Sequence, residues 1–140
     1  MTTLFAMLWI RTLRKPELNS LINDVKHGDA EAIAKAVEFV VAESLGLWHN
    51  RARAKICRYF KNHPPAPDEC RRMVDAIVER LTKGQFYQQF KDQLTMAIRF
   101  APDRMAASAA VASSSDKEYI QRYANWVRHA LYTVKANPNG

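Results

Sequence analysis

The chain has 140 residues, 48% hydrophobic and 25% charged, a balance that is typical of a globular domain with a real core. Its formal charge of +7 suits acidic partners such as an acidic protein surface, nucleic acid or an anionic membrane. Two cysteines are too few for a disulfide framework, which excludes the small disulfide-stapled class of proteins. Only four glycines are present and alternation of valine, isoleucine and threonine is nearly absent, so we predict an all-α protein.

An apolar segment opens the chain, because residues 4–10 are all apolar and the first basic residues follow them. A secretory signal has its charges first, and a bilayer span needs about 20 apolar residues. We therefore expect no transmembrane segment, a cytoplasmic location, and a first helix that Thr2 or Thr3 caps and that ends near Arg14. The segment is either buried or a contact surface for a membrane or for self-association, through Leu4, Phe5, Leu8 and Trp9.

Caps and helix breakers divide the rest of the chain. Pro16 suits the first position of a helix that ends at Gly28, and Asp29 caps the next helix, which ends before Gly46. A helix over residues 47–61 is broken by the prolines of NHPPAP. Later helices are predicted after caps at Asp68, at Asp103 and at Ser115 with Glu118, together with one inside residues 85–101, and the last ends near Val134.

Three of these helices share one spacing of aromatic and apolar residues. Each starts at an aromatic residue and continues 4, 8, 11 and 12 positions later, in the sets Trp48, Ala52, Ile56, Tyr59, Phe60; Phe86, Phe90, Leu94, Ala97, Ile98; and Tyr119, Tyr123, Val127, Ala130, Leu131. Each also follows a helix capped by an aspartate. Offsets of 38 and 33 residues between the sets are typical of two-helix repeats. We therefore expect Trp48, Phe86 and Tyr119 to be buried at equivalent places in successive helix pairs.

On these residues the chain resembles the HEAT/armadillo class of two-helix repeats over residues 29–135. The resemblance implies a right-handed stack of helix pairs, an α-α superhelix with about eight helices. The alternative is a compact irregular helical bundle, since apolar residues at such spacings occur in any bundle. We expect one helical domain over 1–140: a capping pair over 1–28, repeats over 29–62, 68–100 and 103–135, and a tail over 136–140.

Metal binding is not expected from the histidines and cysteines near the middle of the chain. His49 and Cys57 lie eight residues apart on one helix, about 12 Å along its axis, so they cannot share one ion. His63 and Cys70 flank a proline turn, but two ligands do not make a zinc site. We expect two reduced thiols, with no metal and no cofactor.

Catalytic patterns are also weak. The serines at 113–115 are typical of a linker and cap, because a nucleophile needs a positioned base. Asp75 and Glu79 share a helix face with Arg71 and Lys83 one turn away on either side, which favours surface ion pairs over an acid/base pair. There is no glycine-rich phosphate loop. These observations favour a protein that is not an enzyme.

The predicted helix over 47–61 has an apolar arc, expected to be buried, which contains Trp48, Ala52, Ile56, Tyr59 and Phe60 and in which His49 also falls. Its opposite arc is basic, with no acid on the helix. Such a basic arc is usually only solvated. The shared spacing defines three outward positions that are equivalent in all three helices, and no residue at these positions is acidic. They are occupied by Arg51, Gln89 and Arg122; by Lys55, Gln93 and Trp126; and by Arg58, Met96 and His129. In stacked helix pairs such helices often line the concave binding face, and tryptophan beside arginine is typical of a binding hot spot.

The sequence therefore predicts a non-enzymatic protein-interaction module that binds an acidic or mixed peptide, or a helix, in a basic concave groove. Its partner is expected to be an acidic protein. The alternative is a nucleic-acid-binding helical-repeat protein that contacts phosphates through Arg51, Lys55, Arg58, Arg122 and Arg128.

Overall fold

The computed structural model describes residues 9–42, 44, 46–87 and 89–136. A short helical stretch at residues 9–11 precedes seven longer helices. These are α2 (Lys15–Lys26), α3 (Ala30–Val41), α4 (Leu47–Asn62), α5 (Pro67–Lys83), α6 (Phe90–Phe100), α7 (Pro102–Ser113) and α8 (Glu118–Ala136). No strand occurs in the described residues, which confirms the prediction of an all-α protein with about eight helices.

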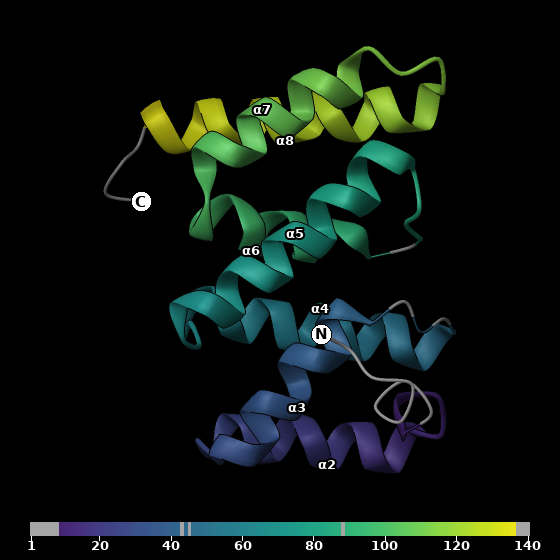
Figure 1. Cartoon of the computed structure of the whole chain (residues 1–140), viewed down its shortest axis with the longest axis vertical. Helices are drawn as coiled ribbons and strands as arrows, with labels where there is room; N and C mark the ends of the chain where they lie inside the picture. Colours follow the sequence, from purple (N-terminus) through teal and green to yellow (C-terminus); the bar gives the residue numbers. More distant parts are fainter. Residues whose placement is uncertain (1–8, 43, 45, 88, 137–140) are drawn as a thin grey trace.

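The helices pack in two alternating series (Figure 1). In one series α3 contacts α5 and α5 contacts α7; in the other α2 contacts α4, α4 contacts α6, and α6 contacts α8. Most helices that follow one another also pack together, most extensively α7 and α8, but α4 and α5 do not pack closely. This order of contacts is the one that stacked helix pairs require, with α2 and α3 at one end and α7 and α8 at the other. A superhelix of the HEAT type stays a prediction.

Local chemistry explains where the helices begin. Asp29 caps α3 as predicted, its carboxylate accepting hydrogen bonds from the backbone N–H groups of Glu31 and Ala32 at 2.9 and 3.3 Å. Asp68 and Asp103 were expected to be caps, but both lie in the first turn instead, because α5 and α7 begin one residue earlier at a proline. Proline is pre-organised for that first position, and the carboxylates there still favour the positive helix end.

Three further boundaries differ from the prediction. Helix α3 ends at Val41 rather than before Gly46. Helix α6 begins only at Phe90, after Gln89 adopts a left-handed backbone with φ of 69°, so Phe86 lies before the helix it was expected to start. Ser115 was expected to cap the last helix together with Glu118. Its hydroxyl instead accepts a hydrogen bond from the backbone N–H of Lys117 at 3.1 Å, and α8 begins only at Glu118.

The aromatic residue that starts the shared spacing in each of the three helices is not part of the fully buried core. Trp48 is 42% exposed and Tyr119 is 40% exposed, while Phe86 is half-buried. An expectation that all three are buried at equivalent places is therefore wrong. Each lies at or before the first turn of its helix, where neighbours cover only one side.

The core runs along the stack and draws on every helix. Its apolar residues form one cluster, whose largest fully buried side chains include Phe39, Phe60, Phe90, Ile77, Leu81, Leu94, Met96 and Met105. Burial of such side chains contributes about 1.5–3 kcal/mol each. None of the helices described here is both long and apolar enough to cross a bilayer. Of the N-terminal contact surface predicted at Leu4, Phe5, Leu8 and Trp9, only Trp9 lies within the described residues, where it is partly buried against the core.

Candidate functional site

The nine residues that the sequence predicts to bind a partner are not all exposed in the structure. On α4, Arg51, Lys55 and Arg58 are exposed, as the basic arc requires. On α6, Gln93 is buried and Met96 is 0% exposed. Helix α6 packs against α4 and α8 as well as α5 and α7, so the face that the repeat spacing turns outward is covered. Met96 belongs to the core and is closed to any partner.

The remaining predicted residues lie at the start of α6 and on α8. Gln89 is exposed at the start of α6, and Arg122 and His129 are exposed on α8, where Arg122 pairs with Glu118 at 3.7 Å. Trp126 is partly buried against the core. Because α6 lies between α4 and α8 (Figure 1), the residues on α8 do not join those on α4 in the hollows that border α4. Their role in binding stays a prediction.

A basic groove, which we call the α2–α4 groove, runs between helices α2 and α4. It consists of two adjoining hollows of about 270 Å³ and 680 Å³ that share Asn19, Ile22 and Lys55 in their walls. Five cations line it, and no carboxylate does so among the described residues. The cations are Lys15 and Lys26 from α2 and Arg51, Lys55 and Arg58 from α4.

The floor and rim of the α2–α4 groove are mixed. Leu18, Ile22 and Ala52 supply apolar surface, and asparagines supply both hydrogen-bond donors and acceptors. The three asparagines are Asn19, Asn23 and Asn62.

Trp48 stands at one end of the α2–α4 groove. The ammonium group of Lys15 lies 4.3 Å from its ring centroid and the guanidinium group of Arg51 lies 5.2 Å away, distances at which cations are attracted to an aromatic face. The two cations therefore hold the half-exposed ring in place between α2 and α4. The sequence placed Trp48 on the buried arc, and this position corrects that expectation.

The opposite side of α2 has the opposite charge. A hollow of about 430 Å³ between α2 and α3 is lined by Glu17, Asp24, Asp29 and Glu31, with Lys35 as its only cation in the described part of the chain. The positive surface therefore stops at α2. It does not continue around this end of the molecule.

The histidines and cysteines do not come together. Groups of three or more potential ligands for a metal ion are absent from the described residues, and both cysteines are free. Burial raises the pKa of the Cys57 thiol to about 12, which makes that thiol a poor nucleophile at neutral pH. His49 packs as expected: it is buried, its Nε2 contacts the Leu13 carbonyl oxygen at 2.8 Å, and its ring lies 5.3 Å from that of Phe39.

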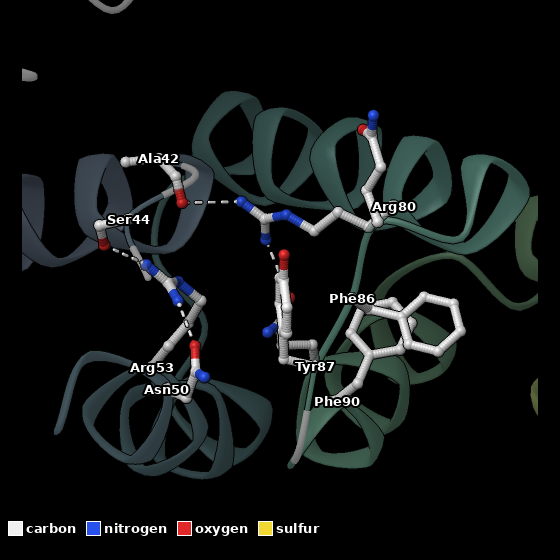
Figure 2. A pocket seen from close by; sticks show the side chains of 10 residues that line it. Ala42, Ser44, Asn50, Arg53, Arg80, Phe86, Tyr87 and Phe90 are labelled. Carbon is white, nitrogen blue, oxygen red and sulfur yellow. Dashed lines mark hydrogen bonds between the residues drawn. The ribbon is translucent and has the colours of Figure 1, made fainter. Parts of the chain in front are cut away.

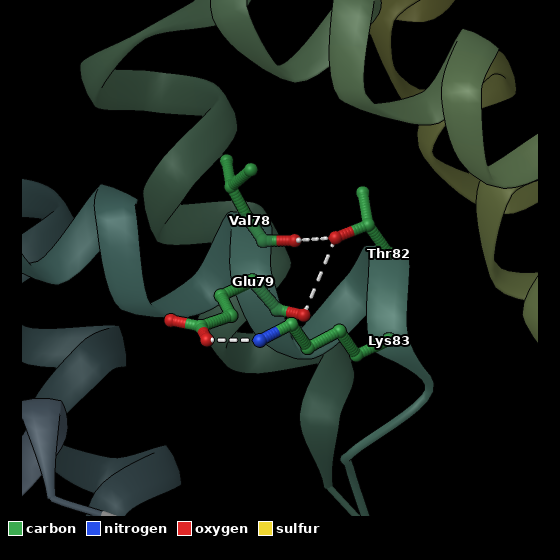
Figure 3. A network of polar contacts seen from close by, with 4 residues as sticks. All are labelled: Val78, Glu79, Thr82 and Lys83. Atoms are coloured by element: carbon green, nitrogen blue, oxygen red, sulfur yellow. Dashed lines mark hydrogen bonds and ion pairs between the residues drawn. The ribbon is translucent and has the colours of Figure 1, made fainter.

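The paired acids of α5 form ion pairs on the surface. Lys83 binds the Glu79 carboxylate at 2.6 Å one turn away, and Figure 3 shows this pair beside the hydroxyl of Thr82, which donates to the Val78 and Glu79 carbonyl oxygens. Hydrogen bonding to Lys83 lowers the pKa of Glu79. Asp75 pairs with Arg104 of α7. The partner expected for Asp75 was Arg71, which pairs with Asp68 instead.

Sequence reasoning missed Lys15, Lys26 and the asparagines of the α2–α4 groove, because only helix packing shows that α2 lies beside α4. It also missed Arg53 and Arg80, which are 4% and 6% exposed. A weak signal for both exists, since Arg53 lies one turn before Cys57 and Arg80 one turn after Ile77, on faces that carry buried residues.

Comparison of the chain with protein-family models, with curated proteins and with solved structures gave no match.

Proposed function

We propose that the protein binds a short acidic polypeptide segment in the α2–α4 groove. The observation that carries this proposal is the lining of that groove: five cations and no carboxylate among the described residues. From Trp48 to Asn62 the groove follows α4 for about 21 Å, which accommodates an extended peptide of about six residues.

The other side chains of the groove favour a peptide as the occupant. Asparagine amides both donate and accept, so they match the N–H and C=O groups of a peptide backbone, whereas a phosphate backbone offers acceptors only. Leu18 and Ile22 give apolar side chains a place to pack. Trp48, flanked by Lys15 and Arg51, resembles the aromatic and arginine anchors of binding hot spots.

A nucleic acid, the second candidate, fits this surface less well. A phosphate-tracking surface tends to be continuous, but the hollow beyond α2 carries Glu17, Asp24, Asp29 and Glu31. A strand that extended past α2 would meet these like charges. Helix α8, whose Arg122 and Arg128 the phosphate alternative requires, lies at the far end of the molecule.

A charge reversal tests the proposal. Arg51 and Arg58 are exposed, Arg51 lies 5.2 Å from the Trp48 ring centroid, and Arg58 makes only a loose pair with Asp92 at 3.9 Å. R51E/R58E should therefore change stability by no more than about 1 kcal/mol per site. Binding of a fluorescent, glutamate-rich six-residue peptide with one leucine should fall by two orders of magnitude or more, about 1.4 kcal/mol per tenfold.

The matched control is R122E/R128E, the same change of charge on exposed positions of α8. It should leave peptide binding unchanged. Loss of binding in this control, together with retention in R51E/R58E, would place the working surface on α8.

Binding of a single-stranded oligonucleotide of six nucleotides, measured at about 150 mM salt, completes the test. The peptide should bind more tightly than the oligonucleotide, because apolar and amide contacts survive screening. Tighter binding of the oligonucleotide would favour the nucleic-acid alternative.

A further inference from the structure

Two arginines converge where α3 ends. Arg53 of α4 donates from Nε to the Phe39 carbonyl oxygen at 3.2 Å, and Arg80 of α5 donates from Nη2 to the carbonyl oxygens of Val41 and Ala42 at 2.9 and 3.0 Å. These acceptors belong to the last turn of α3, whose carbonyl groups lack partners within the helix. The two guanidinium groups thus lie side by side against the negative end of α3, as Figure 2 shows.

The hydrogen bonds of these arginines occupy the acceptor oxygens of the surrounding polar side chains, so that these side chains have mainly N–H and O–H donors left to offer. Arg53 donates to the Asn50 amide oxygen at 3.4 Å and to the Ser44 hydroxyl oxygen at 2.5 Å, and Arg80 donates to the Gln93 amide oxygen at 2.8 Å. Because arginine only donates, each amide must present its oxygen to the arginine and keeps its NH₂ group for another partner. Among the described residues, neither NH₂ group has such a partner, and Arg53 uses three of its five N–H donors.

Charge adds to this excess of donors. Arg53 is 4% exposed and forms no ion pair with any carboxylate that the structure describes. Burial and the neighbouring charge of Arg80 lower the pKa of Arg53 to about 10, so the group is still protonated at neutral pH. Among the described residues, Arg53 is bonded to neutral oxygens. Such an environment is costly for a buried cation, and a nearby anion would offset that cost.

A cavity of about 200 Å³ opens beside these groups. Ser44, Asn50, Arg53, Arg80 and Gln93 form its polar wall, while Phe86, Phe90 and the exposed Tyr87 form an aromatic wall on the other side (Figure 2). The volume is below the range of about 300–1,000 Å³ of sites for drug-sized ligands, so it suits a small ligand or one group of a larger one.

We propose that this cavity binds an oxyanion, the phosphate or carboxylate group of a small molecule, through Arg53 and the amide NH₂ groups of Asn50 and Gln93. The aromatic wall would pack against the apolar part of a carboxylate ligand. The site is separate from the α2–α4 groove, since the two share no lining residue.

The test is a calorimetric titration with inorganic phosphate and with benzoate, in chloride buffer at constant ionic strength. We expect saturable binding of one anion per chain by the unaltered protein. Tighter binding of phosphate would identify a tetrahedral anion as the preferred group, and tighter binding of benzoate an aromatic carboxylate. Binding of neither anion would overturn the proposal.

The variant Q93E separates binding from folding. Its carboxylate keeps the bond to Arg80 as an ion pair, so the melting temperature should not fall, yet it removes a donor and repels the anion. Affinity should fall by about tenfold to a hundredfold. The control Q89E makes the same change at an exposed position outside the cavity and should bind normally.

Two further variants complete the test. If circular dichroism shows that Q93E does not fold, N50D makes the equivalent change against Arg53 and should lose the anion in the same way. The variant R51E/R58E should keep anion binding, which distinguishes this cavity from the α2–α4 groove. Normal affinity in Q93E or N50D, or loss of affinity in R51E/R58E, would overturn the proposal.

Discussion

Gly84 ends α5 with a left-handed backbone, φ 73°, and lies directly against the start of α8. The hydroxyl of Tyr119 donates to the Gly84 carbonyl oxygen at 3.1 Å. A Cβ atom at position 84 would clash with that hydroxyl and would lie 2.7 Å from Cδ1 of Ile120. Glycine is therefore required here both by the backbone and by the close approach of α8.

The variant Gly84→Ala should lower the free energy of unfolding by about 2–5 kcal/mol, the sum of left-handed strain and overpacking. Gly28→Ala is the control, because Gly28 has a similar φ of 80° but nothing within 4 Å of the added atom. That variant should lose only the strain, about 1–2 kcal/mol. Urea unfolding measures both, and equal losses would show that α8 does not press on Gly84.

The arginine cap of α3 is the main feature at the scale of elements. Arg53 and Arg80 come from α4 and α5, and both donate to carbonyl oxygens at the end of α3. They hold together three helices, of which α3 packs on both α4 and α5. The junction of α3, α4 and α5 thus depends on polar contacts inside an otherwise apolar core.

Removal of Arg80 tests this cap. Arg80→Met keeps most of the apolar stem but leaves the carbonyl oxygens of Val41 and Ala42 without their charged donor. We expect a loss of about 2–4 kcal/mol. Arg71→Met, on the exposed face of the same helix with an i,i+3 pair to Asp68, should cost no more than about 0.5 kcal/mol. Similar losses for the two variants in thermal melting would contradict the role of Arg80.

The sequence is sufficient to predict most helices, because their signals are local. The Asp29 cap, the glycines after α2 and α5 and the proline break after α4 act within one turn of the residues concerned. The repeat spacing was a poorer guide to burial. A spacing defines a face of a helix but not what covers that face, so Met96 was assigned to a surface although α6 lies between neighbours.

Of the α2–α4 groove, only the wall formed by α4 could be predicted from the sequence. Arg51, Lys55 and Arg58 follow from the basic arc of one helix. Their counterparts Lys15 and Lys26 depend on a contact between helices about 30 residues apart in sequence, for which the chain carries no local signal. Buried arginines are missed for a similar reason, since a charged residue is expected to face solvent until its hydrogen-bond partners are known.

At the scale of the whole molecule, charge is unevenly distributed around α2, α3 and α4 at one end of the stack. The α2–α4 groove is positive, and the hollow between α2 and α3 is negative. One helix, α2, separates the two surfaces. An acidic segment that approaches this end is therefore attracted to one side of α2 and repelled by the other, which fixes where it docks.

The most direct test of the α2–α4 groove is an NMR titration of the ¹⁵N-labelled protein with the acidic six-residue peptide. The account predicts that chemical-shift changes concentrate on residues 15–26 and 47–63, including the indole N–H of Trp48 and the side-chain amides of Asn19, Asn23 and Asn62. Residues of α7 and α8 should not shift. Changes confined to α8, or the absence of any change at α4 when the peptide binds, would contradict the account.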